Sequence, residues 1–472
     1  MRDDVIYKKL IASLEDPEMQ SCLFFVWVNY AHLLTQKFKI IMEDDVTIRA
    51  LFFFDGTGDN KTNSKANPAK FGNLTNVAKL YEATNETKKF YIEGVGTMDN
   101  KEDSDFAKAT GNNVVGKPGY SYKDKLNLGL NQLNTLVSAN SNRQIELFVY
   151  GFSRGATLAR DFTKRALLNS NVKIRFLGIY DTVVTLLTER PEIFFSDQEL
   201  TRIDQILHLT AINECRKFFP LTSLKNKNGA RELVEIKQYH TDKVKEIFVP
   251  GAHADVGGGY FEQGEKVYLN QVRSSQDALR QLLEKIRTSV KDDFACDPQL
   301  IWPALLGSNV QYESLTIGTN LYSERQNVPV AMSEVYFEVM ADFTNSFSNE
   351  RIFSYASSIV ITELKSLKRE VSDYVTQGAG QKGPCYTYNN YAQFTHISSN
   401  YGFSAENDTN VFLNTFHPTK LNLEIEQAKE QYPDASFDSI DHPSIYNAFG
   451  LVDLGENAPN NDQWHRDEIY GS

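Results

Sequence analysis

Residues 144–160, QIELFVYGFSRGATLAR, are the part of this sequence that most restricts the fold. They predict a buried strand at 145–150, a sharp turn at 151–155 and a helix that begins on small residues. A serine at the centre of such a turn is held in a strained conformation, so the residues two positions away on either side must be small. The segment is therefore typical of a nucleophile elbow, with Ser153 projecting from the sheet. The alternative is an ordinary strand-to-helix turn in which Ser153 caps the helix.

Strand and helix patterns alternate along residues 45–290. The predicted strands cover residues 47–54, 90–96, 145–150, 172–180, 233–239 and 246–249. The predicted helices cover residues 122–137, 154–168 and 275–290. This spacing predicts an α/β fold, a mostly parallel sheet with helices on both faces. Together with the elbow at Ser153, it leads us to expect an α/β-hydrolase-like fold with a mainly helical C-terminal extension.

The length of 472 residues is enough for a large core with added segments. We expect three parts: an N-terminal extension at 1–41, a catalytic core at 42–300, and a C-terminal extension at 301–472 that packs on or caps the core. Within the last part, apolar residues at helical spacing predict one long helix over 349–377. Residues 383–403 are rich in aromatic side chains, which belong to the core or line an acyl-chain site. The polar tail from 455 onward is expected to be disordered or loosely docked.

Polar groups that can carry chemistry follow the predicted strands, and in parallel sheets these strand ends meet at one edge. A serine hydroxyl needs a base to take its proton, and the base needs an acid to orient it. Ser153, Asp181 and His253 follow the chain order of α/β-hydrolases, with acid before base. The alternatives are that Asp181 caps a turn and that His253 is a structural histidine bonded to Asp255. His396 is the rival candidate for the base.

Two glycine-rich loops have a predicted role beside this serine. The Arg154 amide at the helix start and the amides of Gly56 and Thr57 are placed to stabilise an oxyanion, with Asp55 as loop support. A phosphate-binding loop or a plain turn is the alternative for residues 55–60. The second loop supplies Asp255, Gly257 and Gly258 as support behind His253, because consecutive glycines allow the backbone a close approach or a sharp bend.

Composition restricts the partners. The formal net charge of −12 argues against broad binding to nucleic acid or to an anionic membrane surface. The four cysteines, Cys22, Cys215, Cys296 and Cys385, are far apart and are expected to be free thiols.

The apolar stretch at 22–28 is too short to span a bilayer and lacks a basic lead-in, so we expect a docked helix and neither a signal peptide nor a transmembrane segment. Translation from Met42 is an alternative start.

Four segments in order resemble the successive motifs of a bacterial and fungal α/β-hydrolase family, formerly of unknown function, that includes the type VI secretion phospholipase effectors of the GxSxG kind, type one. The segments are FFFDGTGDN at 52–60, GFSRGA at 151–156, IYDTV at 179–183 and PGAHADVGGGY at 250–260, and residues 208–222 are similar to a segment between the last two. The resemblance implies a Ser–Asp–His hydrolase on Ser153, Asp181 and His253 that cleaves glycerophospholipids as a phospholipase A.

The same resemblance implies a toxin that is cytoplasmic in the producer and is delivered by a secretion system, without a signal peptide, into the periplasm of neighbouring cells. It also implies an immunity protein that neutralises the toxin in the producer. Contact with the membrane surface would then be transient. No metal and no cofactor are expected. Two alternatives stay open: a catalytically silent hydrolase-fold adaptor of a secretion system, and a metal-dependent phosphatase that uses Asp55, Asp59, Asp255 and His253.

Overall fold

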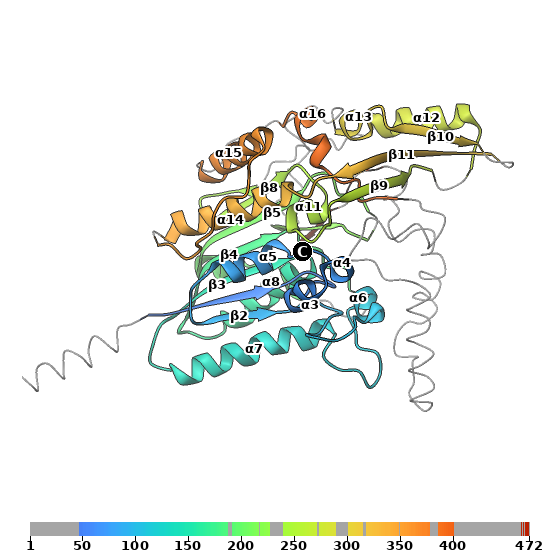
Figure 1. The fold of residues 1–472 in the computed structure, drawn as a ribbon. Helices are drawn as coiled ribbons and strands as arrows, with labels where there is room; N and C mark the ends of the chain where they lie inside the picture. The colour runs from blue at the N-terminus through green and yellow to red at the C-terminus, as the bar shows by residue number, and fades with distance from the viewer. Residues whose placement is uncertain are drawn as a thin grey trace, which may run out of the picture.

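A seven-stranded sheet runs through the centre of the molecule (Figure 1). The structure is a computed structural model that describes residues 47–186, 191–216, 218–226, 239–270, 273–288, 301–314, 318–348, 350–377, 386–400, 464, 466 and 468–471. The predictions for residues 1–41, the apolar stretch at 22–28, Met42, and three of the four cysteines lie outside the described residues. Among those described, no helix is both long and apolar enough to cross a lipid bilayer.

The strands of the central sheet lie in the order β2-β1-β3-β4-β5-β8-β7. Six of them are parallel, and the short β7 pairs antiparallel with β8. Their bounds are β1 Ile48–Phe54, β2 Lys89–Ile92, β3 Ile145–Phe152, β4 Val172–Tyr180, β5 Ile203–Ala211, β7 Tyr239–His240 and β8 Val244–Val249. The near-continuous apolar runs of the central strands fit a parallel sheet that is covered on both faces. The predicted fold class is thus confirmed.

Successive side chains of β1 point to opposite faces of the sheet, as the pleat requires. Phe52 and Phe54 pack into a core with helices α7 (Tyr122–Ala139) and α8 (Arg154–Ala166). Phe53 packs into a second core on the other face, with α5 (Asn76–Ala83), α12 (Gln276–Arg287), α14 (Met332–Ser348) and α15 (Thr362–Thr376). Figure 1 shows α7 on one side of the sheet and α14 and α15 on the other.

Most of the predicted core elements are confirmed, with ends shifted by a few residues. The strand predicted at 90–96 is shorter, because β2 ends at Ile92. Strand β5, which lies between β4 and β8, was not predicted. Most of the strand predicted at 233–239 lies outside the described residues.

The prediction of one helix over 349–377 is wrong. Helix α14 ends at Ser348, residues 350–361 are not helical, and α15 starts at Thr362. The side-chain amide of Asn345 in α14 explains the break, since it accepts from the backbone N–H of Phe353 and donates to the Phe353 carbonyl, both at 2.9 Å. Phe353 is buried, whereas Val360 on the predicted apolar stripe is 77% exposed. The apolar spacing in this segment reflects an extended strap along α14.

The remaining described elements lie outside the central sheet, and several of them add side chains to the second core. They are α3 Lys61–Ala66, α4 Pro68–Phe71, α6 Asp105–Thr110, α9 Asp197–Thr201, β6 Leu221–Asn226, α11 His253–Gly257, β9 Gln263–Tyr268, α13 Ile301–Leu306, β10 Val310–Ser314, β11 Thr319–Val328, α16 Tyr388–Tyr391, a 3₁₀ turn Ala392–Phe394, and β12 Glu468–Gly471. Strands β9, β10 and β11 form a three-stranded antiparallel sheet.

The end of the chain contradicts the prediction of a disordered or loosely docked tail. Strand β12 pairs in parallel with β6, with Glu468 opposite Leu221. Trp464 and Arg466, just before β12, are almost fully buried. Burial of these two side chains anchors the described part of the tail in the protein.

Candidate active site

The turn between β3 and α8 has the geometry of a nucleophile elbow. Ser153 has φ 58° and ψ −128°, a conformation that non-glycine residues rarely adopt. A β-carbon on Gly151 would lie 2.5 Å from the Gly155 carbonyl oxygen, and one on Gly155 would lie 2.2 Å from the Asp55 carbonyl oxygen. The Ser153 side chain makes no capping hydrogen bond to α8. The turn therefore does not match the alternative of an ordinary helix cap.

Gly155→Ala is expected to destabilise this turn strongly, because backbone atoms cannot move aside for the new methyl group. We expect the free energy of unfolding to fall by about 1–3 kcal/mol, measured by urea denaturation. Gly129→Ala on α7 is the matched control. The three atoms nearest to its methyl group would belong to the side-chain rings of Phe54 and Phe162, at 3.0 Å or more, and alanine improves helix propensity. Equal stability of the two variants would contradict the tight packing of the elbow.

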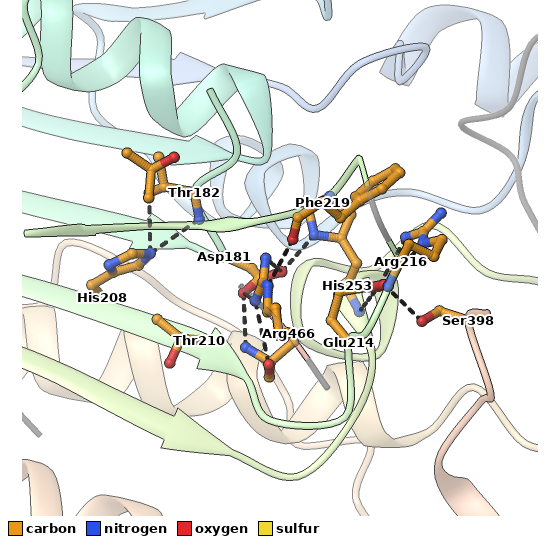
Figure 2. Close-up of polar contacts among 12 residues, drawn as sticks. Asp181, Thr182, His208, Thr210, Glu214, Arg216, Phe219, His253, Ser398 and Arg466 are labelled. Atoms are coloured by element: carbon orange, nitrogen blue, oxygen red, sulfur yellow. Dashed lines mark hydrogen bonds and ion pairs between the residues drawn. The ribbon is translucent and has the colours of Figure 1, made fainter. Parts of the chain in front are cut away.

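Asp181 follows the last residue of β4, and His253 opens α11 after β8. His253 Nδ1 lies 2.6 Å from Asp181 Oδ2, and both side chains are fully buried. Asp181 Oδ1 also accepts from the backbone N–H of Ala211 at 2.8 Å. Figure 2 shows His253 and Asp181 meeting although they come from different strand ends. His253 therefore pairs with Asp181 and not with Asp255, and Asp181 acts as more than a turn cap.

The elbow and this pair are adjacent in the structure. The Ser153 backbone N–H donates to the carbonyl of Tyr180, the residue before Asp181, at 3.1 Å. The ring of Phe152 lies 4.6 Å from the His253 ring, centre to centre. The structure thus brings the three predicted residues to one edge of the sheet, at the carboxyl ends of β3, β4 and β8.

Burial and nearby charges together set the ionisation of this pair. Burial opposes ionisation of Asp181, but the Arg466 guanidinium and the contact with His253 outweigh it and hold the pKa of Asp181 well below its usual range. Burial lowers the pKa of His253, and the nearby Asp181 carboxylate only partly opposes this. At neutral pH His253 is therefore a neutral imidazole beside a carboxylate. That is the resting state of a general base.

A second buried ion pair borders His253, and the sequence analysis missed it. Glu214 accepts from Arg216 Nε at 3.0 Å and Arg216 Nη2 at 2.9 Å, and its Oε2 lies 3.4 Å from the His253 backbone nitrogen. Despite burial, Arg216 lowers the pKa of Glu214 to about 2. Ser398, from the C-terminal extension, donates to Glu214 at 2.9 Å. The only sequence signal for this pair was the resemblance of residues 208–222 to a family segment.

His208 and Glu246 support the loop that carries Asp181. The backbone N–H of Thr182 donates to His208 Nε2 at 3.0 Å, so Nε2 is the acceptor and Nδ1 carries the proton. That Nδ1–H lies 3.0 Å from Glu246 Oε2. Both side chains are buried, and burial lowers the pKa of His208. His208 is therefore a neutral, structural histidine that bonds Thr182, the residue that follows the acid Asp181.

His396, the rival base, belongs to a different pair. Its Nδ1 lies 2.6 Å from Asp255 Oδ1, and its backbone N–H donates to Asp255 Oδ2 at 2.8 Å. The same Oδ2 accepts from the Ala252 backbone N–H at 2.9 Å. Asp255 therefore joins the start of α11 to the C-terminal extension, and the structure gives His396 no contact with Asp181.

The loop after β1 holds its carboxylates away from those pairs. Asp55 accepts from the Gly56 N–H at 2.9 Å, from Thr75 Oγ1 at 2.6 Å, and from the Tyr91 hydroxyl. The Gly56 amide is thus already engaged. Among the described residues, the N–H groups of Thr57 and Arg154 have no hydrogen-bond acceptor. These two amides are the candidate oxyanion donors.

The glycines after His253 are as constrained as the sequence analysis expected. A β-carbon on Gly257 would lie 2.0 Å from the Phe152 ring, and one on Gly258 would lie 2.8 Å from the Asn76 backbone nitrogen. Gly258 also has φ +83°. The backbone therefore passes closely behind the elbow, as only glycine allows.

The proposed metal-dependent alternative does not match the geometry. In the part of the chain that the structure describes, no group of three or more His, Cys, Asp and Glu side chains is arranged to hold a metal ion. Of the four residues named for it, Asp55 bonds Thr75 and Tyr91, and the buried Asp59 lies near Asp55. His253 instead bonds Asp181, and Asp255 bonds His396. They form three separate sets.

Comparison with known proteins identifies the family of this chain. Residues 49–164 and 159–285, together half of the chain, match the family described as "T6SS, Phospholipase effector Tle1-like, catalytic domain". This chain belongs to the Tle1-like family. The matched residues include the elbow, the Asp181 loop and the His253 loop. The Tle1-like catalytic domain therefore supplies Ser153, Asp181 and His253, whereas His396 and Arg466 come from beyond the matched residues.

A comparison with solved structures supports the same fold for this Tle1-like chain through one match. The first is the "Structure of the Tle1 effector bound to the VgrG spike from the Type 6 secretion system", with 17% sequence identity, a TM-score of 0.55, and coverage of 90% of this chain and 94% of that one. The second is an uncharacterized protein from Pseudomonas aeruginosa, with 17% identity and a TM-score of 0.38 over 90% of this chain and 66% of that one. No curated protein matches the chain significantly.

Proposed function

We propose that this Tle1-like protein is a serine esterase of the phospholipase A kind, with Ser153 as nucleophile, His253 as general base and Asp181 as the acid that orients the base. The observation that carries the proposal is the buried 2.6 Å contact between His253 Nδ1 and Asp181 Oδ2, beside a serine in a strained elbow. A carboxylate on Nδ1 fixes the tautomer in which Nε2 is free to accept a proton.

The residues support a two-step mechanism. His253 Nε2 is buried and has no hydrogen-bond partner in the described part of the chain. It takes the proton of Ser153 Oγ while that oxygen attacks the ester carbonyl. The resulting oxyanion is stabilised by the Arg154 and Thr57 N–H groups. Protonated His253 then donates to the leaving alkoxide, and a water molecule activated by His253 hydrolyses the acyl-enzyme.

Family membership and fold also support a proposal for the substrate of the protein and for its route of delivery. We infer that the substrate is a glycerophospholipid and that the protein is an effector delivered without a signal peptide into neighbouring cells. A component of the secretion spike is the proposed carrier, by analogy with the Tle1 effector that is bound to VgrG. An immunity protein in the producer is a further proposed partner. Ser153 is only 3% exposed, so lipid access requires movement of neighbouring residues.

Lipid product analysis tests this function. Purified protein is incubated with phosphatidylethanolamine and phosphatidylglycerol vesicles, and products are identified by mass spectrometry. We expect free fatty acid and lysophospholipid from the wild type and neither from Ser153→Ala. Diacylglycerol or phosphatidic acid would indicate cleavage of a phosphate ester and contradict the mechanism. No product from folded wild type, on these vesicles and on short-chain p-nitrophenyl esters, would favour the silent adaptor.

The pH dependence of hydrolysis reports on His253. Because burial lowers the pKa of His253, the neutral base persists below the pH at which an exposed histidine protonates. We expect the acidic limb of kcat/KM for a soluble p-nitrophenyl ester to have its midpoint below about pH 6.5. Circular dichroism at each pH checks that the protein stays folded. A midpoint clearly above that value would contradict the buried environment of the base.

A further inference from the structure

The carboxylate of Asp181 has a second strong partner, which comes from the end of the chain. Arg466 Nη1 donates to Asp181 Oδ1, and Nη2 donates to Oδ2 at 3.0 Å (Figure 2). The Arg466 side chain is 2% exposed and that of Asp181 is fully buried. A bidentate contact between a guanidinium and a carboxylate, with two parallel hydrogen bonds, fixes both groups in one plane. Arg466 therefore restricts the orientation of the same carboxylate that holds His253.

The guanidinium is itself fixed by its surroundings. Arg466 Nε donates to the Phe219 carbonyl at 2.8 Å, and Nη1 lies 3.3 Å from the Ala211 carbonyl. Trp464, two residues earlier, packs edge-on against Trp302 with ring centres 5.4 Å apart. Strand β12, two residues later, pairs with β6. Phe219, just before β6, also contacts the His253 ring, with centres 5.0 Å apart. The tail thus holds Arg466 from both sides.

Arg466 is one of the buried charged groups around the His253–Asp181 pair. Around the imidazole lie two buried carboxylates, Asp181 and Glu214, and two buried guanidinium groups, Arg466 and Arg216. Other ionisable groups of the described chain near these charges are the Cys215 thiol, the Tyr260 hydroxyl and the His208 imidazole, which are all buried, and Asp255, which is paired with His396. The four charges sum to zero before His253 takes a proton. Without Arg466 the set would be negative and would stabilise the imidazolium.

We propose that Arg466 is a positioning residue of this active site, so that the C-terminal segment completes the catalytic centre. Arg466 keeps Asp181 ionised and oriented toward His253 Nδ1, and it prevents His253 from retaining the proton taken from Ser153. A base that retains its proton too strongly is a poor acid toward the leaving alkoxide. This inference rests on the proposed esterase function and deepens it.

Substitution of Arg466 tests the proposal through the pH profile. In Arg466→Gln we expect kcat/KM for a p-nitrophenyl ester at neutral pH to fall about tenfold or more, chiefly in kcat, and the acidic limb to move up by about one pH unit. Arg466→Lys keeps the charge but not the bidentate contact, so its acidic limb should stay near that of wild type while kcat falls. An unchanged profile in folded Arg466→Gln would overturn the proposal.

Two further measurements separate this role from a purely structural one. Arg325→Gln is the matched control, because Arg325 forms a largely buried ion pair with Glu265 and contacts neither Asp181 nor His253. It should lower stability without moving the acidic limb. In Arg466→Ala, added guanidinium ion below denaturing concentration should restore activity. If guanidinium does not restore activity to a folded Arg466→Ala protein, the contact between Arg466 and Asp181 does not set the activity, which contradicts the proposal.

One readout does not depend on turnover. In protein labelled on histidine, NMR titration gives the pKa of His253 directly, with the His253→Ala spectrum for assignment. We expect this pKa to rise by about one pH unit in Arg466→Gln and to stay near the wild-type value in Arg466→Lys. Wild type without esterase activity would refute the proposed function alone. An unchanged His253 pKa in Arg466→Gln would refute the role of Arg466 alone.

Discussion

Ser153→Ala is expected to lower kcat/KM for ester hydrolysis by at least about 10⁴-fold, which corresponds to about 5.5 kcal/mol of transition-state stabilisation. The substitution removes the only atom that would form the acyl-enzyme. It should leave the fold intact, because the Ser153 side chain caps no helix and alanine is no larger than serine. Rates are measured with a p-nitrophenyl ester and with phospholipid vesicles.

The control for this variant is Ser333→Ala. Ser333, in α14, is also a buried serine, but its hydroxyl donates to the Val330 carbonyl just before that helix, and it is remote in sequence from the elbow. Its loss should change kcat/KM by less than tenfold. The double variant Ser153→Ala/His253→Ala should have a kcat/KM no lower than that of Ser153→Ala alone, because the effects of residues that act as one unit are not additive. Equal rates in wild type and Ser153→Ala would remove the proposed nucleophile.

The second large effect separates the two histidine–aspartate pairs. His253→Ala is expected to lower kcat/KM by about 10⁴-fold, because Ser153 would lose its base and Asp181 its imidazole. His396→Ala should keep kcat/KM within about tenfold of wild type, since His396 bonds Asp255 and not Asp181. It should instead lower stability, because Asp255 would lose a buried hydrogen bond.

The two substitutions form a matched pair, because both remove a buried imidazole that bonds an aspartate at 2.6 Å. Thermal unfolding and kcat/KM are measured side by side on both variants. The expected pattern is a large rate loss for one and mainly a stability loss for the other. Retained activity in His253→Ala together with lost activity in His396→Ala would assign the base to His396.

Much of the fold was predictable because local sequence and tertiary environment agree. The apolar runs of β1, β3 and β4 are long enough to indicate strands that are buried on both faces. Strand β5 was missed because polar residues interrupt its apolar pattern. His208 and Thr210 are buried there only because they bond Glu246 and the Ile247 carbonyl. A single sequence cannot show that these partners lie on the neighbouring strand.

The same distinction explains which site residues could be predicted. Ser153, Asp181 and His253 each follow a strand, so the topology of a parallel sheet brings them together. Arg466 lies 285 positions from Asp181 in a polar segment with no strand or helix pattern. Its position depends on the pairing of β12 with β6 and on Trp464, which are long-range contacts. Composition alone therefore predicted a loosely docked tail, although Arg466 in this segment bonds Asp181 in the site.

A fluorophosphonate probe gives the most direct test of the central claim that Ser153 is activated by His253 and Asp181. Such a probe reacts covalently only with an activated serine, and peptide mass spectrometry identifies the modified residue. We expect a single adduct, on Ser153, in the wild type and a labelling rate reduced by orders of magnitude in His253→Ala. Folded wild type that stays unlabelled, or an adduct on another serine, would contradict the account.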